Sequence, residues 1–590
     1  MNPLVSDRFI DFLLSDVLAV EELCKLPAFE GHGPETIGPW LAACRRLARE
    51  VLFPAYREVD AQPPRFEHGR VFVHPRLHQA WKELVALGVI SASRPSSVGG
   101  QQLPLTVATL SHAYLMAGNL AAYGFAGLTN GAAHLIEAFG SDEVRALFLG
   151  KLYGGEWTGT MALTEPQAGS SLADVTTRAR PAEGGTHLIS GAKIFISGGD
   201  QDLTENIVHL VLARLDGAPA GTRGISLFAV PRLRPEAGAL VPNDVHVTGV
   251  IHKIGWRGLP SLALSFGEEG ACRGWLVGPP NQGLKCMFQM MNEARLMVGV
   301  NAAATASVAF HESLAYARER KQGRSASEPK LGELGPQVAL VEHADVRRML
   351  LRQKAIVEGA LGLIGICARY ADLSEHSPEG AVRARSKLLL DLLTPIAKTF
   401  PSEKGFEANA LAVQIHGGYG YSSEYLPEAW LRDQKLNTIH EGTSTIQGLD
   451  LLGRKIVAGG GAALVALREE IEPDLAAARE QGLEVKVLEQ ALDHLTEATA
   501  TLGARGAGGD VEGMLAHSAD FLELASTVVI GWVWTKLARA TMGRPDDFSQ
   551  GLRSAQQYWY ASELPRVPAL AALCTGPDRS FLDVKSEWLG

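Results

Sequence analysis

The feature that most constrains the fold of this chain is a change of hydrophobic period near residue 155 and its reversal near residue 280. Before residue 155, apolar residues recur at helical spacing in RFIDFLLSDVLAVEELCKL, GPWLAACRRLAREVLFPAYREV and HPRLHQAWKELVALGVI. The short runs HLISGAKIFISGG, NIVHLVLARLD, GISLFAVP and DVHVTGVI follow, rich in Val, Ile and Leu and bounded by Gly, Pro and Asp, as is typical of strands. The helical period returns after GPPNQG at 278–283. We therefore expect a mainly α protein with a central β domain.

A Gly-rich stretch, AGGGAA at 458–463, marks a further boundary. We expect an N-terminal helical domain over 1–155, a middle β domain over 156–280, a helical bundle over 281–457 and an additional helical domain over 458–590. This order is not the βαβ alternation of a Rossmann domain. Neither a GxGxxG run after a strand nor a GxxxxGK[ST] phosphate loop is present.

Composition narrows the functional class. The chain has 590 residues, 46% apolar and 20% charged, with a net charge of -10. Residues 461–590 carry 19 acidic against 11 basic side chains, which argues against a nucleic-acid partner. No apolar run approaches the ~20 residues of a membrane span, and no basic-then-apolar leader is present. The six cysteines lack CxxC spacing, so we expect no disulfide framework and no metal site, but a soluble, cytoplasmic enzyme.

One carboxylate stands among small residues in NTIHEGTSTIQG, residues 437–448. Glu441 precedes Gly442, which permits close approach of a backbone or ligand, and the hydroxyls that follow offer hydrogen bonds without bulk. The alternative is an ordinary turn with an exposed Glu before the next helix. The residues alone leave both interpretations open.

Four other stretches carry similar ambiguity. TEPQAGSS at 164–171 is compatible with an anion-binding turn or with a plain loop between domains. GAKIFISGG places Phe195 and Ser197 at a strand end, to flank a planar ligand or to pack a core. RERKQGR at 318–324 and the glycine pair of QIHGGYGY at 414–421 suit phosphate contact and close ligand approach, or a charged helix end and a turn.

Taken together, these motifs resemble a family. ALTEPQAGS, GAKIFIS, RERKQGR, QIHGGYGY, the RD of LRDQK and IHEGTSTIQ occur in the order found in acyl-CoA dehydrogenases, over residues 40–456. The length, RFIDFLLSDVL, LLTPIAKTF and LDLLGRK resemble the large bacterial subclass that includes 3-methylmercaptopropionyl-CoA dehydrogenases and broad-range fatty acyl-CoA dehydrogenases. The resemblance implies an N-terminal helical domain, a β-barrel-like middle domain, a C-terminal four-helix bundle and an additional C-terminal helical domain.

The resemblance also implies a reaction and a base. In that family a carboxylate removes the pro-R α proton of an acyl-CoA thioester, a hydride passes from the β carbon to N5 of FAD, and a trans-2-enoyl-CoA forms. Glu441 matches the base, and Gly442 keeps its backbone open to the thioester. Burial is expected to raise the pKa of the base toward working pH. Electron-transfer flavoprotein is the implied electron acceptor.

The remaining site residues carry over by motif. Ser197 matches the residue that hydrogen-bonds flavin N5. The implied FAD contacts are Met161, Leu163, Thr164, Gly169, Ser170, Phe195, Ile196, Ser197, Arg320, Gln322, Gln414, Gly417, Gly418, Thr443 and Thr445. The implied acyl-CoA contacts are Ser170, Asn292, Arg295 and Gly442. Arg320, Gln322, Gln414, Gly417 and Gly418 match residues that reach the FAD of a neighbouring subunit, which implies a homodimer.

This sequence departs from the family pattern at three positions in or beside these motifs. His440 replaces the usual Tyr before the base, Ser171 replaces an Asp, and Asn292 replaces an Asp of some relatives. They leave the acyl group and the pH optimum open.

Four alternatives remain. An acyl-CoA oxidase would pass electrons to oxygen. A nitroalkane oxidase-like enzyme would use Asp as its base, against Glu441. A DNA-associated flavoprotein would need a basic C-terminal surface, and a non-catalytic scaffold would not need Glu441.

Overall fold

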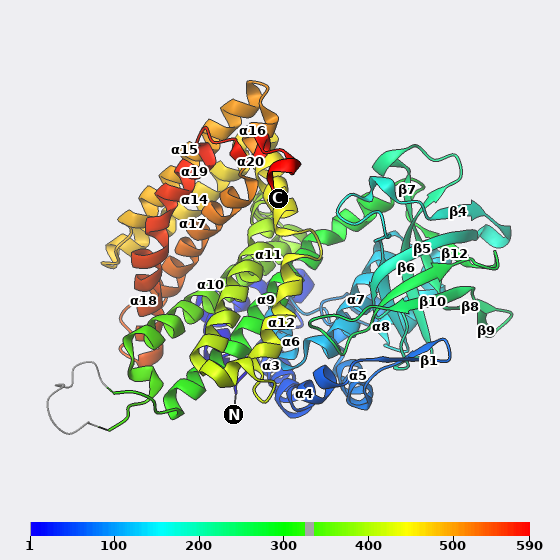
Figure 1. Cartoon of the computed structure of the whole chain (residues 1–590), viewed down its shortest axis with the longest axis horizontal. Helices are drawn as coiled ribbons and strands as arrows, with labels where there is room; N and C mark the ends of the chain where they lie inside the picture. The colour runs from blue at the N-terminus through cyan, green and yellow to red at the C-terminus, as the bar shows by residue number, and fades with distance from the viewer. Residues whose placement is uncertain (1, 325–335) are drawn as a thin grey trace. The chain divides into compact units, whose positions relative to one another are not determined.

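A computed structural model describes residues 2–324 and 336–590 of the chain, without the side chains of residues 288–292 and 458. The chain forms two compact units. Unit 1 comprises Met1–Glu30, Leu105–Leu110 and Arg295–Gly590, and unit 2 comprises Gly31–Pro104 and Ser111–Ala294. Helices dominate, and one large sheet lies in the middle of the sequence (Figure 1). The expected fold class, mainly α with a central β domain and an extra helical region after residue 458, is confirmed.

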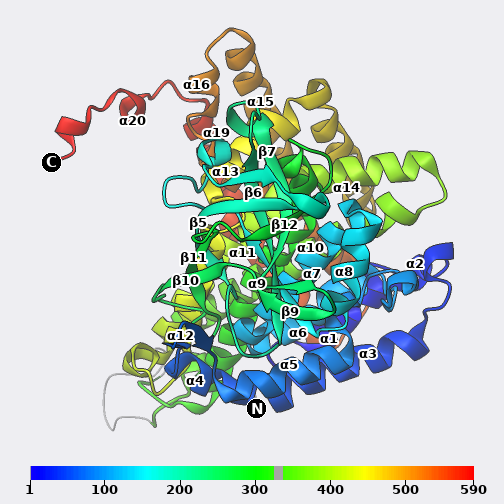
Figure 2. The same ribbon diagram turned by 90° about the vertical axis from the view of Figure 1, so that its right-hand side faces the viewer.

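Unit 2 contains the sheet. Its strands are β1 (Arg65–Glu67), β2 (Arg70–Phe72), β3 (Trp157–Ala162), β4 (Arg178–Pro181), β5 (His187–Ser197), β6 (Asn206–Leu215), β7 (Ile225–Pro231), β8 (Leu233–Glu236), β9 (Ala239–Pro242), β10 (Val245–Val250), β11 (Ser261–Phe266) and β12 (Arg273–Val277). The main sheet runs in the order β10-β11-β5-β12-β7-β6-β3, and β4 pairs with both β5 and β6. Figure 2 labels the strands β5, β6, β7, β10, β11 and β12 of this sheet. β3 and β4 pair with β6 in parallel, and the other pairs are antiparallel. The pairs β1-β2 and β8-β9 form separate ribbons.

Unit 2 also contains helices. They are α3 (Pro34–Leu47), α4 (Phe53–Ala61), α5 (Pro75–Leu87), α6 (Leu105–Gly118), α7 (Leu120–Phe139) and α8 (Asp142–Tyr153), and the first residues of α6 belong to unit 1. Of these, α7 and α8 pack on β3, the edge strand of this sheet. α7 lies directly on β3: the Gly159 N–H donates to Thr129 Oγ1 at 3.1 Å, and a Cβ at Gly159 would stand 2.4 Å from that of Ala132. Because Gly159 has no side chain, α7 packs closely against β3, the strand that ends at the candidate site.

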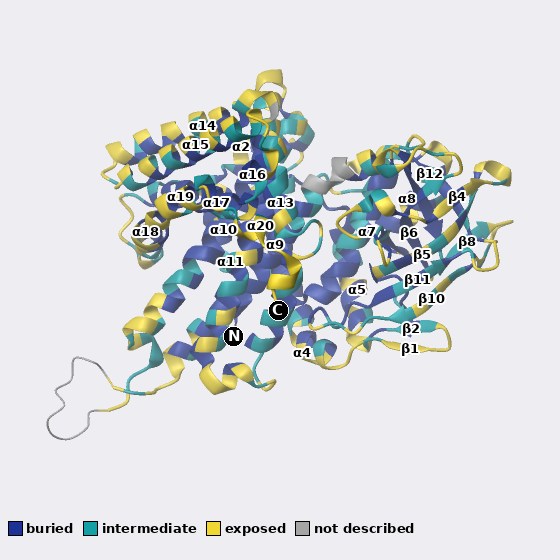
Figure 3. Cartoon of the chain, turned by 45° about the horizontal axis from the view of Figure 1, so that its top comes forward, coloured by how far each residue is buried: buried dark blue, intermediate teal, exposed yellow. Residues whose placement is uncertain are grey.

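Unit 1 is helical. Its helices are α1 (Asp7–Phe12), α2 (Val20–Leu23), α9 (Gly283–Glu319) from Arg295 onward, α10 (Ala344–His376), α11 (Gly380–His416), α12 (Pro427–Gln434), α13 (Ser444–Asp450), α14 (Ala462–Glu480), α15 (Lys486–Ala507), α16 (Val511–Leu515), α17 (Ser518–Arg539), α18 (Asp547–Tyr558), α19 (Val567–Thr575) and α20 (Ser580–Asp583). α10 and α11 pack along each other, and α17 contacts both this bundle and the helices that follow it. α10 and α17 are mostly dark blue, hence buried, in Figure 3.

α17 is the core helix of the C-terminal region. Trp532 and Trp534 are fully buried, and their indole N–H groups donate to Asp474 and to the Ala355 carbonyl. Among the described residues, α17 alone has the length and apolar composition of a membrane span, and 89% of its apolar window is buried inside the protein. A core helix of a soluble protein meets the same criteria.

The first residues of the chain also belong to unit 1. The sequence periodicity predicts one helix over residues 8–26, but the structure breaks it at Ala19, whose φ of +45° lies in the left-handed region. Asn2 donates to the Val308 carbonyl of α9 at 2.9 Å, and Ser307 donates to the Leu4 carbonyl at 2.8 Å. This segment is therefore built into the bundle formed by much later residues.

Candidate functional site

The loop that carries Glu441 has an unusual backbone. It joins the short 3-10 turn Lys435–Thr438 to α13. Glu441 has a φ of +54° and Gly442 a φ of +89°. A non-glycine residue with positive φ is uncommon, and such strain persists where the surroundings fix it, often at functional sites. Thr443 caps α13 by accepting a hydrogen bond from the Ile446 N–H at 3.3 Å.

Hydrogen bonds join this loop to α11. Lys398 donates to the Asn437 carbonyl at 2.7 Å, and Gln434 donates to the Pro401 carbonyl at 3.0 Å. One turn further along α11, Glu403 accepts a hydrogen bond from Ser444 Oγ. Contacts on both sides of Glu441 thus tie the loop to one helix.

Glu441 is exposed to solvent. Desolvation raises the pKa of Glu441 above its ordinary value, while the charges of Arg295 and Lys398 act in the opposite direction. A carboxyl with a raised pKa that solvent and ligand can reach has the properties of a general base.

The imidazole beside the base is neutral at physiological pH. Burial, reinforced by the positive charge of Lys398, lowers the pKa of His440 to about 3. His440 therefore adds no charge next to Glu441. The departure from the family's Tyr leaves a neutral polar ring at this position.

Arg295 is nearly buried and bound within its own unit. Its Nη1 donates to Asp450 Oδ2 at 2.6 Å, and Asp450 also accepts from Arg454. Contact of Arg295 with acyl-CoA stays a prediction, because the structure shows the side chain engaged by α13. Asn292 lies among the residues whose side chains the structure does not describe.

In unit 2, a β-bulge places Phe195. Lys193 pairs with Leu264 and Ile196 with Leu262, so two residues of β5 face one residue of β11. Phe195 adopts a φ of +61°, and 60% of its surface is exposed. The bulge turns Lys193 and Ile196 inward and Phe195 outward, which strict alternation along a strand does not allow.

The end of β3 joins this bulge. Lys193 Nζ donates to the Leu163 carbonyl at 3.0 Å, and the Ile194 N–H donates to the Thr164 carbonyl at 2.9 Å. The structure therefore brings together two groups of residues that the sequence assigned to FAD: Met161, Leu163, Thr164 from β3 and its end, and Phe195, Ile196, Ser197 from β5.

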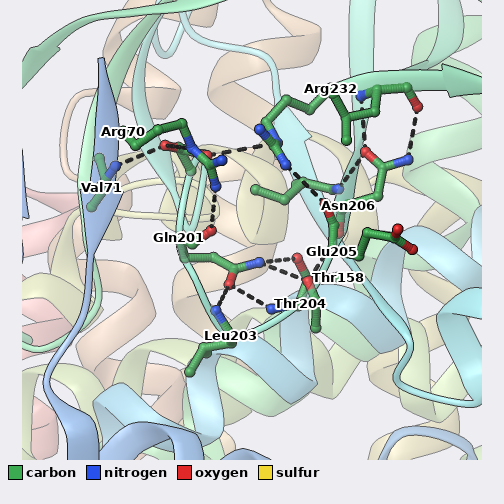
Figure 4. A network of polar contacts seen from close by, with 12 residues as sticks. Arg70, Val71, Thr158, Gln201, Leu203, Thr204, Glu205, Asn206 and Arg232 are labelled. Atoms are coloured by element: carbon green, nitrogen blue, oxygen red, sulfur yellow. Dashed lines mark hydrogen bonds and ion pairs between the residues drawn. The ribbon is translucent and has the colours of Figure 1, made fainter. Parts of the chain in front are cut away.

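A polar network fixes the loop after Ser197 (Figure 4). Asp200 accepts hydrogen bonds from Arg70 Nε at 3.1 Å and from the Val71 N–H at 2.8 Å. Gln201 donates to Thr158 Oγ1 of β3 at 2.9 Å, and Asn206 donates to the Leu233 carbonyl at 2.8 Å. The loop that follows Ser197 is thereby anchored to β2 and β3.

Glu165 organises the turn that follows β3. Its carboxylate is buried and accepts hydrogen bonds from Lys193 Nζ at 2.8 Å, from the Thr176 N–H at 2.7 Å and from the Thr177 N–H at 3.0 Å. Gly169 and Ser170 lie between these anchors and are exposed, and a Cβ at Gly169 would meet no atom within 4 Å. The turn presents a small, open backbone at two of the positions that the resemblance assigns to FAD.

The residues assigned to a neighbouring subunit's FAD lie on one exposed face of unit 1. Tyr316 of α9 stacks on His416 of α11 with ring centroids 4.3 Å apart. This contact joins the end of α9, where Arg320 and Gln322 are exposed, to the end of α11. There Gln414, Gly417 and Gly418 are exposed as well.

Sequence reasoning missed the residues that hold the site. Lys398, Glu403 and Gln447 fix the base loop, and Asp200 fixes the loop after Ser197. LLTPIAKTF did contain a signal, because a lysine at an inward position of an apolar helical run needs a specific acceptor. The acceptors themselves are far away in sequence.

Family models match almost the whole chain. Residues 40–156, 160–268 and 281–456 match the N-terminal, middle and C-terminal domains of acyl-CoA dehydrogenase, and residues 467–585 match "acetyl-CoA dehydrogenase C-terminal like".

Individual relatives agree with these models. The chain is 38% identical over 88% of its length, and 88% of the relative's, to 3-methylmercaptopropionyl-CoA dehydrogenase of Ruegeria pomeroyi. It is 32% identical to the broad-specificity linear acyl-CoA dehydrogenase FadE5 of Mycobacterium tuberculosis, covering 97% of this chain and 92% of that one. An acyl-CoA dehydrogenase of Bacillus anthracis complexed with FAD shares the fold with a TM-score of 0.75 at 20% identity, covering 99% and 92% of the two chains. The chain belongs to the acyl-CoA dehydrogenase family of FAD-dependent oxidoreductases.

Proposed function

We propose that this protein oxidises the bond between the α and β carbons of an acyl-CoA thioester to give a trans-2-enoyl-CoA, with Glu441 as the base. The observation that carries the proposal is the strained, anchored loop that presents a carboxyl of raised pKa to solvent. Removal of the α proton leaves an enolate, which forms only if its oxygen is stabilised as charge develops. The Glu441 N–H donates to no group among the described residues, which leaves it available to that oxygen.

The residues of unit 2 suit FAD. Phe195 offers an exposed aromatic face, Ser197 a hydroxyl on an anchored strand end, and Gly169 and Ser170 an open backbone turn. When bound, FAD accepts the hydride from the substrate β carbon at its N5 atom. Met161, Leu163 and Thr164 would support the ring system. Thr443 and Thr445 of the base loop would contribute further contacts.

The experiment follows from the chemistry. Purified protein is expected to be yellow and to bleach when mixed anaerobically with a saturated acyl-CoA. Glu441→Gln is expected to retain the yellow colour and to lose at least ~100-fold in bleaching rate, the lower range of a general base's contribution. A variant that bleaches as fast as the wild type would show that Glu441 is not the base.

The acyl group is to be identified with a panel of butyryl-, octanoyl-, palmitoyl-, isobutyryl-, 3-phenylpropionyl- and 3-methylthiopropionyl-CoA. The sequence relatives named for linear acyl-CoA and for 3-methylmercaptopropionyl-CoA favour an unbranched chain. We expect the unbranched members of the panel to bleach the flavin faster than the isobutyryl and phenylpropionyl members.

Electron-transfer flavoprotein is the proposed acceptor, and oxygen is the alternative. Anaerobic turnover with electron-transfer flavoprotein, without hydrogen peroxide production in air, is the expected result. Rapid peroxide formation with each substrate turnover would identify an oxidase instead.

The exposed face of Arg320, Gln322, Gln414, Gly417 and Gly418 supports a homodimer in which each copy contributes to the other's FAD site. Arg320→Ala is expected to weaken FAD binding, because a phosphate would lose a charged partner. Light scattering on the flavin-loaded protein tests the dimer directly. A monomer that holds FAD as tightly as before would contradict it.

A further inference from the structure

Lys398 is a buried cation that pairs with no carboxylate in the part of the chain that the structure describes. Its side chain is 0% exposed in the middle of α11, and among the described residues it forms no ion pair. Its one hydrogen bond there runs from Nζ to the Asn437 carbonyl at 2.7 Å. Burial of an unpaired charge is costly, so the groups around it must stabilise the ammonium by their fields.

The charges that act on Lys398 include that of the proposed base, Glu441. Burial lowers the pKa of Lys398 to about 8, while the carboxylates of Glu403 and Glu441 raise it and Arg295 lowers it. His440, the other titratable group in the loop, is neutral at physiological pH. The negative charges that compensate Lys398 therefore come from Glu403 on its own helix and from Glu441 in the loop above.

Arg295 acts differently, although it also lowers the pKa of Glu441. Its charge is matched by Asp450, at 2.6 Å, in an ion pair that is itself nearly buried. Of the two cations, Arg295 lowers the pKa of Glu441 more than Lys398 does, but among the described residues Lys398 forms no ion pair of its own. Lys398 also touches the backbone at the beginning of the loop, four residues before the base.

We propose that Lys398 is a positioning residue for Glu441: it fixes the carbonyl from which the base loop begins, and its charge favours the carboxylate form of the base. The inference rests on the proposed function, since it assigns Lys398 a role only if Glu441 removes the α proton. Two effects are separable. The hydrogen bond acts on the rate at high pH, and the charge acts on the pH at which the base becomes protonated.

The test is the pH profile of anaerobic flavin bleaching by the best substrate of the acyl-CoA panel. Lys398→Met removes both effects. We expect its acid limb to move up by about one pH unit, the lower range for loss of a neighbouring charge. We expect its rate at high pH to fall about tenfold, because the base loop loses its anchor. Flavin content and apparent Kd for substrate should change less than the rate.

Lys398→Arg keeps the charge but changes the hydrogen-bond geometry. It is expected to retain the wild-type acid limb with a reduced rate at high pH. It also keeps the proposal falsifiable if Lys398→Met does not fold, since a displaced acid limb in the arginine variant would overturn the role of the charge.

Lys404→Met is the matched control, because Lys404 lies on the same helix but pairs with Glu407 and Glu523, both at 2.8 Å. It is expected to lower stability and to leave the acid limb in place. An unchanged acid limb in Lys398→Met, or an equal shift in Lys404→Met, would overturn the inference while leaving the proposed function intact. Wild-type bleaching by Glu441→Gln would instead reject the proposed base itself.

Discussion

Gln447 donates its side-chain amide to the carbonyl of Glu441 at 3.2 Å, so the helix that follows the base holds the base's own peptide group. The same Nε2 atom lies 3.4 Å from the Gly442 carbonyl, and Gln447 is fully buried. The left-handed conformation at both loop residues is thus maintained by a residue of α13. Loop geometry and helix position are coupled through one side chain.

Gln447→Met is expected to reduce the bleaching rate by about tenfold to a hundredfold, because a small displacement of a catalytic group is sufficient for such a loss. The methionine preserves volume and removes the donor. Flavin content should remain that of the wild type. Gln550→Met removes a comparable bond, to the Pro545 carbonyl on the exposed side of α18, and should leave the rate unchanged. A rate within twofold of wild type for Gln447→Met would argue against this coupling.

Gly442→Ala is expected to slow the bleaching reaction by more than its loss of unfolding free energy explains. The new Cβ would stand 2.6 Å from Gln447 Nε2, and the φ of +89° disfavours any side chain. Gly459→Ala is the matched control. It introduces the same type of strain at a φ of +60°, but its Cβ would come no closer than 3.7 Å to another side chain. Both variants should lose about 1 kcal/mol of unfolding free energy from the backbone, but only Gly442→Ala should slow the bleaching reaction. Equal rates in the two variants would contradict the expectation.

Lys193→Met is expected to destabilise the protein by about 3–5 kcal/mol, because it leaves the buried Glu165 carboxylate without its cation. Urea unfolding measures this loss, and Glu165→Gln combined with Lys193→Met should recover part of it. Arg65→Met removes an exposed ion pair with Glu67 and should cost under about 1 kcal/mol. Unfolding free energies that agree between Lys193→Met and the wild type would exclude a structural role for the pair.

Glu165 also implies an acid limit to stability. Burial acts to raise the pKa of Glu165, but the Lys193 charge and the hydrogen bonds from Thr177 and Thr176 outweigh it and lower the pKa to about 2. A depressed pKa stabilises the fold above the ordinary value of 4.5, and the contribution is lost as pH falls toward 2. Part of the acid unfolding measured between these values should disappear in the Glu165→Gln, Lys193→Met double variant.

Asp372 implies the opposite pH dependence. Its carboxylate caps α6 by accepting from the Leu105 N–H at 2.7 Å and the Thr106 N–H at 2.9 Å. Burial raises its pKa to about 6, although the hydrogen bonds from Thr106 and Leu105 act to lower it. A raised pKa means that the stabilising contribution is complete below 3.8 and is lost as pH rises to about 6. The unfolding free energy of Asp372→Asn minus that of the wild type should therefore rise between pH 3.8 and about 6 and then level off. A difference that does not vary with pH would contradict the assignment.

Local sequence patterns predicted the elements well where one physical signal dominated. The apolar runs at 187–199, 206–216, 224–231 and 244–251 contain β5, β6, β7 and β10, because Val- and Ile-rich runs between turn residues suit a pleated sheet. The helical period gave the mainly α class with its central sheet. The order of six motifs identified the family, which the domain matches confirmed.

Other features depend on contacts between distant residues. The β1-β2 ribbon lies partly in a stretch whose Gly and Pro residues predict a loop. It is held by a hydrogen bond from the Val71 N–H to the Asp200 carboxylate. The outward turn of Phe195 results from the register with β11, which a single strand's sequence does not encode. Lys398 lies in LLTPIAKTF, a motif on which the family resemblance depends, but its acceptor is the Asn437 carbonyl. Every residue has a backbone carbonyl, so the sequence does not identify this acceptor.

The docking of residues 2–10 onto α9 sets an order of events during synthesis. Leu4, Val5, Phe9 and Ile10 leave the ribosome long before α9 does, and all are fully buried in the folded protein. The carbonyl that Asn2 binds is translated 306 residues later. At about 5–20 residues per second, this interval is on the order of tens of seconds. During that time the nascent chain exposes this apolar segment, because the part of α9 that buries it has not yet been made.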